Sequence, residues 1–272
     1  MAGCCIYSGQ YSRAKGEDLL RMSLVEFRDV SHTYPPDRQA LRSINLKINQ
    51  GEHFGLVGPS GAGKSTLLRA INGLIVPSSG KVEVLGQTVN HLGDKDLMRL
   101  RRQIGMIFQE GALIERLSVL TNVLVGRLGY VDTAPSLIRK FPREDVEKAR
   151  IAIEEVGLSG YEHYRVRNLS GGQRQRVGIA RALVQGAKII LGDEPTASLD
   201  VRTAEEILGL LVKLADEHGA TLVLSLHNVF SARRFCKRIV ALYDGSLVWD
   251  GPASDFTESV VERVFYPESR SC

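Results

Sequence analysis

The stretch Gly58-Pro-Ser-Gly-Ala-Gly-Lys-Ser65 decides the fold, because it fits the template G-x-x-x-x-G-K-[ST] of a phosphate-binding loop. The apolar segment 53–57 directly before it has the pattern of the strand that such a loop follows. After the loop, apolar side chains recur at helical spacing, namely Leu67, Leu68, Ile71, Leu74 and Ile75. Strand, loop and helix in this order predict a helix N-terminus that binds anions.

The residue types within the loop suit phosphate binding. Its glycines allow backbone conformations that a Cβ would forbid, so that successive N–H groups converge on phosphate oxygens. Lys64 adds a positive charge for the β- and γ-phosphates, and Ser65 offers a hydroxyl to Mg²⁺. The alternative is a glycine-rich turn that caps a helix by coincidence, and the order of strand, loop and helix argues against it. The expected nucleotide-binding residues are Gly58, Pro59, Ser60, Gly61, Ala62, Gly63, Lys64, Ser65 and Thr66.

An acidic pair follows a second apolar run. Residues 189–192 have the pattern of a short buried strand, which would deliver Asp193 and Glu194 to the carboxyl end where open α/β sheets bind ligands. Asp193 is expected to help hold Mg²⁺, and Glu194 is placed to polarise the attacking water. Alone, the pair could be a solvated acidic turn before Pro195. Together with the phosphate loop it indicates a phosphoryl-transfer site.

A further helix start lies in Leu169-Ser-Gly-Gly-Gln173, where Ser170 and two glycines present backbone donors. Read alone, this stretch could be a flexible surface loop. In company with the other two motifs it resembles the signature of the ATP-binding-cassette (ABC) ATPases. The resemblance implies an α/β fold of the P-loop NTPase (RecA-like) type, with an antiparallel β subdomain and an inserted α-helical subdomain. It also implies ATP and Mg²⁺ as ligands.

The same resemblance suggests roles for residues outside these motifs. Gln109 resembles the Q-loop glutamine that senses Mg²⁺ and water, Ser198-Leu-Asp200 resembles the D-loop, and His227 resembles the switch histidine that contacts the γ-phosphate. Tyr34 resembles the aromatic residue on which adenine stacks. A structural histidine and a half-buried tyrosine at a strand end are the alternatives. The implied catalytic residues are Lys64, Gln109, Glu194 and His227, the metal ligands Ser65, Gln109 and Asp193, and the signature contacts Ser170, Gly171, Gly172 and Gln173.

Secondary structure can be predicted around these motifs. Segments 24–30 and 43–49 alternate apolar and polar residues and predict antiparallel strands ahead of the core. An amphipathic pattern over 204–215 predicts a helix after Asp200, and Asp244-Gly245 lies between two apolar runs that predict a hairpin. Two positions depart from the family pattern without removing a reactive group, and these are Gly192 before the acidic pair and Asn228 after the switch histidine.

The chain reads as one nucleotide-binding unit. We expect a disordered leader over 1–21, the ABC nucleotide-binding domain over 22–252 with its helical subdomain at about 94–171, and a tail over 253–272 that forms a short helix. The leader has no apolar core of a secretory signal. The four cysteines, Cys4, Cys5, Cys236 and Cys272, show neither metal-ligand spacing nor a disulfide framework.

Composition narrows the class of protein. With 272 residues, 43% hydrophobic and 24% charged, the chain can bury a substantial core. It has no apolar run long enough to span a bilayer. The formal net charge is only +4 and the basic residues are scattered, so we expect no nucleic-acid partner.

Within the ABC ATPases, the chain from Met22 onward resembles the phosphonate-import ATPases. The likeness is densest over 108–130 and is echoed by Ser225-Leu-His-Asn. It implies a homodimer that shares two ATP sites, integral membrane permease subunits, a solute-binding protein that acts through the permease, and a peripheral location at the cytoplasmic face of the cell (inner) membrane. The cargo would be phosphonate or a related reduced-phosphorus oxyanion. The alternatives are another ABC transporter (an amino-acid importer or a lipoprotein or peptide exporter), a non-transport ABC ATPase, and an ordinary P-loop kinase.

Overall fold

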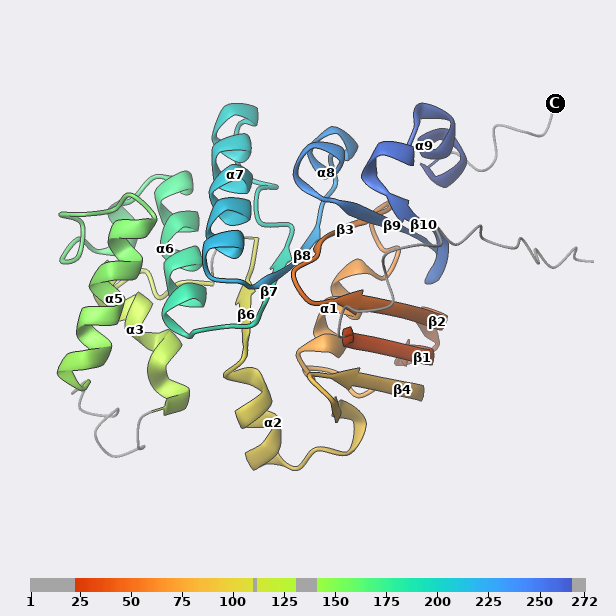
Figure 1. The fold of residues 1–272 in the computed structure, drawn as a ribbon, viewed down its shortest axis with the longest axis horizontal. Helices are drawn as coiled ribbons and strands as arrows, with labels where there is room; N and C mark the ends of the chain where they lie inside the picture. Colours follow the sequence, from red (N-terminus) through yellow and green to blue (C-terminus); the bar gives the residue numbers. More distant parts are fainter. Residues whose placement is uncertain (1–22, 110–111, 131–140, 266–272) are drawn as a thin grey trace, which may run out of the picture.

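The computed structural model describes residues 23–109, 112–130 and 141–265, which form two sheets and a group of helices (Figure 1). The leader 1–21 with Cys4 and Cys5, and Cys272 at the other end, lie outside the described residues. One sheet has six strands in the order β10-β9-β3-β8-β7-β6, and the other has four in the order β2-β1-β4-β5. The predicted α/β fold with an antiparallel subdomain is confirmed.

The six-stranded sheet positions the site. β3 (His53–Val57), β8 (Thr221–Ser225), β7 (Ile189–Asp193) and β6 (Ile104–Ile107) run parallel, and β9 (Arg238–Tyr243) runs parallel to β3. These strands are nearly continuous apolar runs because helices cover both faces of a parallel sheet. Their carboxyl ends therefore bring the segments after β3, β7 and β8 to one edge.

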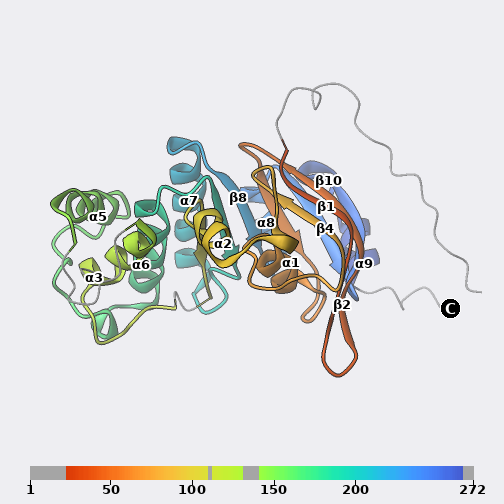
Figure 2. The ribbon, with the colours of Figure 1, turned by 90° about the horizontal axis from the view of Figure 1, so that it is seen from below.

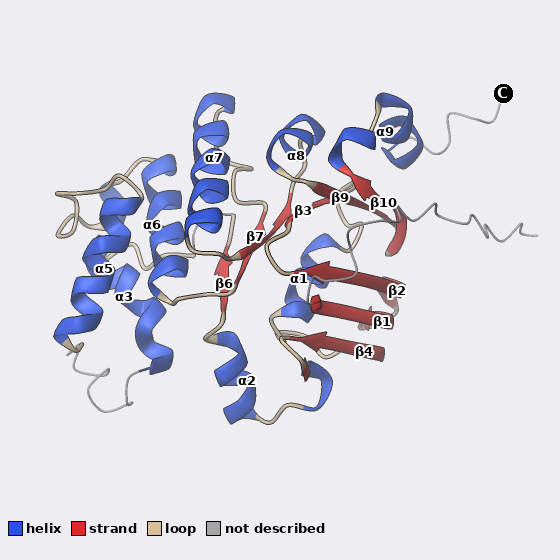
Figure 3. Ribbon diagram, in the orientation of Figure 1, coloured by secondary structure: helices blue, strands red, loops and turns tan. Residues whose placement is uncertain are grey.

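Separate apolar cores cover the two faces. On one face, α1 (Lys64–Ile71) lies between the two sheets, and Leu67, Leu68 and Ile71 pack with residues of both. On the other face lie α7 (Val201–Glu217), α8 (Val229–Phe235) and α9 (Glu258–Phe265), which Figure 3 shows in blue above the red strands. The helix that follows the phosphate loop, α1, is thus packed between the two sheets.

The antiparallel sheet is formed largely by strands that precede the phosphate loop in the chain, as predicted. β1 (Ser23–Tyr34) pairs with β2 (Arg38–Asn49) and with β4 (Ser79–Val84), and β4 pairs with the short β5 (Gln87–Thr88). The strands predicted over 24–30 and 43–49 are confirmed, and both extend further. The predicted hairpin is also confirmed, since β9 turns at Asp244-Gly245 into β10 (Ser246–Pro252).

Most of the remaining helices gather at the end of the molecule away from the antiparallel sheet, as Figure 2 shows from below. They are α3 (Val119–Leu124), η3 (Val125–Tyr130), α5 (Arg143–Glu155), η4 (Val166–Asn168) and α6 (Gly171–Val184). The range 94–171 predicted for the helical subdomain is not helical throughout. It begins with α2 (Asp94–Arg101), which follows η2 (Val89–His91), and it contains β6, a strand of the six-stranded sheet.

The first core helix is shorter than predicted, whereas the helix predicted after Asp200 is present. α1 ends at Ile71, so the predicted continuation to Leu74 and Ile75 is wrong: Gly73 turns the chain with a φ of 61°, and Leu74 is 48% exposed. The helix predicted over 204–215 is confirmed within α7, and the tail carries η5 (Ala253–Asp255) and α9. Within the described ranges, no helix is long and apolar enough to cross a membrane.

Candidate functional site

The phosphate loop has a backbone that requires glycine at two of its positions. Gly58 has a φ of 147° and Gly63 a φ of 105°. A Cβ at Gly58 would lie 2.2 Å from the carbonyl oxygen of Leu242, and one at Gly63 would lie 2.4 Å from that of Ala40. The loop therefore folds tightly against β9 and β2, and Gly63 becomes the residue before the first turn of α1. This arrangement directs the N-terminus of α1 at the loop.

Lys64 is buried within the loop that it serves. Its side chain is 4% exposed, and Nζ donates to the carbonyl oxygens of Gly58 at 2.9 Å and Pro59 at 3.1 Å. Burial lowers the pKa of this ammonium, and the carboxylates of Glu194 and Asp193 oppose that shift. A phosphate in the loop would give the buried charge a stronger partner than the two carbonyls do.

Ser65 and Asp193 meet although 128 residues separate them. The Ser65 hydroxyl donates to Asp193 Oδ1 at 2.8 Å, which joins the start of α1 to the end of β7. A hydroxyl and a carboxylate oxygen are hard oxygen ligands of the kind that Mg²⁺ takes. Among the described residues, no group of three or more His, Cys, Asp or Glu side chains forms a metal cluster. An ion here would take the rest of its coordination from water and substrate phosphates, as Mg²⁺ commonly does.

Glu194 and His227 form a close pair at the same edge. Glu194 Oε1 lies 2.6 Å from His227 Nε2 and 3.9 Å from Lys64 Nζ. The Glu194 side chain is 20% exposed and that of His227 is 47% exposed, so the pair lies at the rim of the buried loop. The Glu194 carboxylate thus contacts His227 and is partly exposed. A hollow of about 210 Å³ borders the pair.

Both departures from the family pattern have a local explanation. A Cβ at Gly192 would lie 2.6 Å from Leu224 Cδ2 and 3.2 Å from Pro195 Cγ, so a larger residue would not fit without movement. Asn228 caps α8, because its Oδ1 accepts from the backbone N–H groups of Phe230 and Ser231. Asparagine caps a helix about as well as the more frequent aspartate.

Tyr34 lies at the end of β1, where it pairs with Arg38 across the hairpin to β2. Arg38 reaches the phosphate loop, since a Cβ at Gly61 would lie 3.5 Å from Arg38 Nη2. The Tyr34 ring packs edge-on against His32, with the ring centroids 4.6 Å apart and the planes at 89°. Tyr34 thus lies on the hairpin whose Arg38 approaches the phosphate loop.

The signature lies elsewhere, at the start of α6 in the helical part (Figure 1). Ser170 and Gln173 form a capping box: Gln173 N–H donates to Ser170 Oγ at 3.3 Å, and Ser170 N–H donates to Gln173 Oε1 at 2.9 Å. Asp200 caps α7 by accepting from Thr203 N–H at 3.0 Å. The two helix starts are adjacent, because a Cβ at Gly172 would lie 2.7 Å from Thr203 Cγ2. Ser170, Gly171 and Asp200 are all exposed.

Residues 41–197 match the family model described as ABC transporter. The chain belongs to the ABC transporter family. It is 47% identical over 248 residues to the phosphonates import ATP-binding protein PhnC of Alcaligenes faecalis, covering 91% of this chain and 90% of the relative. It is 46% identical over 244 residues to PhnC of Staphylococcus aureus, covering 90% and 95%. The predicted resemblance to ABC ATPases, and among them to phosphonate-import ATPases, is confirmed.

Solved structures of ABC cassettes have the same fold. The dimeric, post-hydrolysis cassette MJ0796 bound to ADP and Pi superposes with a TM-score of 0.73 at 37% identity, covering 84% of this chain and 98% of that one. CbiO1 of Clostridium perfringens, part of the transporter complex cbiONQ, gives a TM-score of 0.77 at 28% identity, covering 90% and 96%. Members of the family thus bind adenine nucleotide in a cassette of this shape.

The structure divides the predicted ABC site residues into two groups. The phosphate loop, Asp193, Glu194 and His227 meet at the edge formed by β3, β7 and β8. Tyr34 lies on the hairpin whose Arg38 approaches the loop. The signature and Asp200 meet at a second place, on α6 and α7. Gln109 is exposed two residues beyond the end of β6 and is not brought into the hydrogen-bonded group around Asp193.

One residue of the first group was missed by sequence reasoning. Ser225, the last residue of β8, hydrogen-bonds to both Asp193 and Glu194. In the sequence, Ser225 stands out only as the first residue of Ser225-Leu-His-Asn, which resembles the phosphonate-import ATPases, and as a hydroxyl at the end of an apolar run. Many strands end in this way, so the pattern does not single it out.

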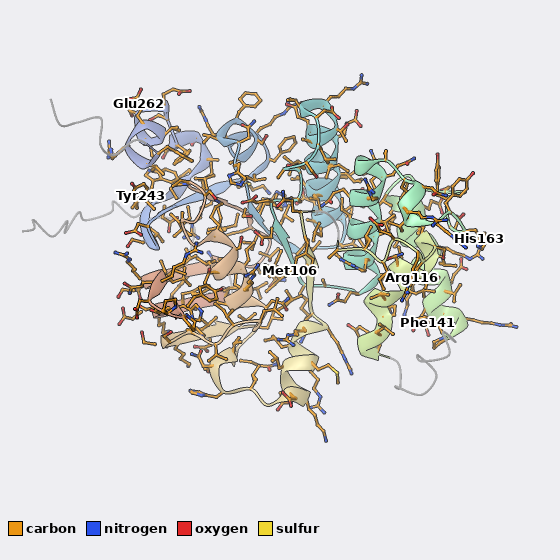
Figure 4. All side chains as sticks on the ribbon, turned by 180° about the vertical axis from the view of Figure 1, so that it is seen from behind. Met106, Arg116, Phe141, His163, Tyr243 and Glu262 are labelled. Atoms are coloured by element: carbon orange, nitrogen blue, oxygen red, sulfur yellow. The ribbon has the colours of Figure 1, made fainter. Side chains whose placement is uncertain are left out.

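A cleft of about 370 Å³ lies beside β6. Residues of α2, of α6 and of the 108–130 stretch line it. Met106 of β6 also lines the cleft. Figure 4 shows Met106 near the middle of the molecule, with Arg116 and His163 to one side of it, among the helices. The apolar lining of the cleft includes Met98 and Phe108, and its basic lining is Arg101, Arg102 and Arg181.

Proposed function

We propose that this chain is the ATP-hydrolysing subunit of an ABC importer that takes up phosphonate or a related reduced-phosphorus oxyanion. The observation that carries the ATPase part is the meeting of Ser65, Asp193, Glu194 and His227 beside the buried Lys64. The cargo rests on the relatives, which are named phosphonates import ATP-binding proteins and align over nine-tenths of the chain.

Each residue of the edge has a part in hydrolysis. The loop N–H groups and Lys64 bind the phosphates. Ser65 and Asp193, with Gln109 as a further ligand, would hold Mg²⁺, which would supply positive charge against the phosphates. Glu194 accepts a proton from the attacking water, and His227, 2.6 Å away, keeps that carboxylate in place and faces the γ-phosphate. Tyr34 stacks on adenine. Positioning and charge stabilisation supply most of the catalysis in such a site.

The second half of each ATP site comes from a second copy of the chain. One chain carries one phosphate loop and one signature, and its signature is exposed and distant from its own loop. A homodimer with two-fold symmetry would place each signature, with Ser170, Gly171, Gly172 and Gln173, over the partner's loop. The dimeric form of the cassette MJ0796 supports this arrangement.

The membrane partner binds at the cleft beside β6. This cleft lies next to Gln109, is lined with apolar and basic side chains, and includes residues of the stretch in which the likeness to phosphonate-import ATPases is densest. A permease segment seated there would be close enough to Gln109 to respond to nucleotide. The subunit then lies peripherally at the cytoplasmic face of the cell membrane, and a solute-binding protein delivers the cargo to the permease.

Stimulation of the reconstituted transporter tests the cargo. The complex of this chain, its permease and the solute-binding protein is supplied with methylphosphonate, phosphite, phosphate or an amino acid, and ATP hydrolysis is measured. We expect methylphosphonate or phosphite to stimulate hydrolysis only when the binding protein is present. Stimulation by the amino acid alone would contradict the cargo and leave the ATPase intact. An assay without any phospho-acceptor separates the ATPase from a kinase.

A further inference from the structure

Ser225 connects the two acidic residues of the site through one buried hydroxyl. The residue ends β8 and is fully buried. Its Oγ donates to Asp193 Oδ1 at 3.0 Å and accepts the backbone N–H of Glu194 at 2.9 Å. Both the donor and an acceptor position of the hydroxyl are therefore used on the acidic pair.

The backbone of Glu194 needs this support. Its φ of 51° lies in the left-handed region, where residues other than glycine are uncommon and which costs free energy unless the surroundings hold it. The Glu194 amide at the end of β7 also needs an acceptor. Asp193 pairs with Ser225 in the register between β7 and β8, so the serine side chain reaches both residues from the neighbouring strand.

Asp193 Oδ1 accepts hydrogen bonds from two hydroxyl groups, and only one of these groups is expected to change partner when Mg²⁺ binds. Ser65 donates to it at 2.8 Å but is also expected to turn its hydroxyl to Mg²⁺. Ser225 approaches from the sheet, at 3.0 Å, and has no such second role. It is in place to keep the carboxylate oriented when Ser65 changes partner. His227 follows Ser225 by two residues, so the end of β8 also positions His227.

We infer that Ser225 is a positioning residue of the ATPase site: its hydroxyl orients the Asp193 carboxylate and holds the Glu194 backbone so that the Glu194 carboxylate meets His227. The inference rests on the proposed ATP hydrolysis at this edge. The Ser225 side chain is fully buried, and its hydroxyl acts through Asp193 and Glu194. It acts in the way that outer residues of metal sites orient the inner ligands.

The test compares Ser225→Ala with a matched variant on the same strand. Thr221, also fully buried, accepts the N–H of Gly51 at 2.9 Å at the other end of β8. Thr221→Val removes a comparable hydrogen bond far from the acidic pair. We expect both variants to lower the unfolding temperature, but only Ser225→Ala to lower kcat, by about 10- to 100-fold, and to raise the Mg²⁺ concentration for half-maximal turnover, with little change in the KM for ATP.

Two further measurements keep the inference falsifiable. Ser225→Thr restores a hydroxyl and should recover most of the turnover, and Ser225→Cys, of similar size with a weaker donor, replaces the alanine variant should that variant not fold. In a Glu194→Gln background, Ser225→Ala should raise the Mg²⁺ concentration needed for ATP-driven dimers in light scattering. Wild-type kcat and Mg²⁺ dependence in Ser225→Ala would overturn the positioning role. A wild-type chain without ATPase activity would instead overturn the proposed function.

Discussion

The edge around the phosphate loop and the edge around the signature are built differently. At the first, Lys64 is 4% exposed, and hydrogen bonds between distant segments join Ser65, Asp193 and Ser225. At the second, Ser170 and Asp200 are exposed, and each caps its own helix through a residue three positions away. The first edge is organised within one chain, whereas the second presents its helix starts outward. The proposed homodimer would bring the second edge of one copy to the first edge of the other.

The largest effect is expected at Glu194 and tests whether the first edge supplies the general base for ATP hydrolysis. Glu194→Gln keeps the size of the side chain and removes the base, so ATP turnover should fall by about 10²- to 10⁴-fold while ATP still binds. Turnover and nucleotide binding by the purified full chain measure the two effects separately. As a control, Glu217→Gln at the exposed end of α7 should leave turnover unchanged. Near-normal hydrolysis by Glu194→Gln would remove this residue from the base role.

Much of the first edge could be predicted from the sequence, because its motifs are local. The loop, the strand before it and the acidic pair each occupy a short segment whose residue types match their chemistry. The end of α1 was not predictable from the apolar pattern, since Leu74 continues the spacing. The structure ends the helix because Gly73 turns the chain beside Leu97, and a Cβ there would lie 2.5 Å from Leu97 Cδ1.

Contacts across the sheet were harder to predict than motifs. Ser225 reaches Asp193 and Glu194 only because β7 and β8 are neighbours, and strand order is a tertiary property. The proximity of Gly172 to Thr203 likewise depends on how α6 and α7 pack. The sequence could identify the signature as a helix start, but it could not show that this start lies beside Asp200 and far from the chain's own loop.

The next effect tests the division between the two edges. Lys64→Ala damages only the loop and Ser170→Arg only the signature, so each homodimer should be inactive. In an equal mixture, random pairing makes half of the dimers mixed, and each mixed dimer has one intact site, so about a quarter of wild-type activity should return. Measured turnover of the mixture gives the answer. If the mixture stays inactive although scattering shows dimers, each ATP site would take its loop and its signature from the same chain.

A smaller effect is expected at Tyr34, on the hairpin whose Arg38 approaches the phosphate loop of the first edge. Tyr34→Ala should weaken ATP binding by about 1–3 kcal/mol, the usual value of one stacked base. The hydroxyl of Tyr34 is buried without a hydrogen-bond partner among the described residues, so Tyr34→Phe should bind ATP as the wild type does. Thr33→Ala, at the exposed neighbour, is the control. Equal loss in the alanine and phenylalanine variants would argue against stacking.

The smallest effect concerns the stability that the second edge provides for itself. Hydrogen bonds from Thr203 lower the pKa of Asp200, so this carboxylate stabilises the fold above its unfolded-state pKa, and the contribution is lost as the pH falls through the folded-state pKa. Asp200→Asn keeps the cap acceptor and loses the charge, which favours a helix N-terminus. Thermal unfolding of the two proteins should therefore differ slightly at pH 7 and converge in acid. An equal difference at every pH would mean that cap geometry, and not charge, is what Asp200 contributes, which would leave its charge free for a role at the partner subunit.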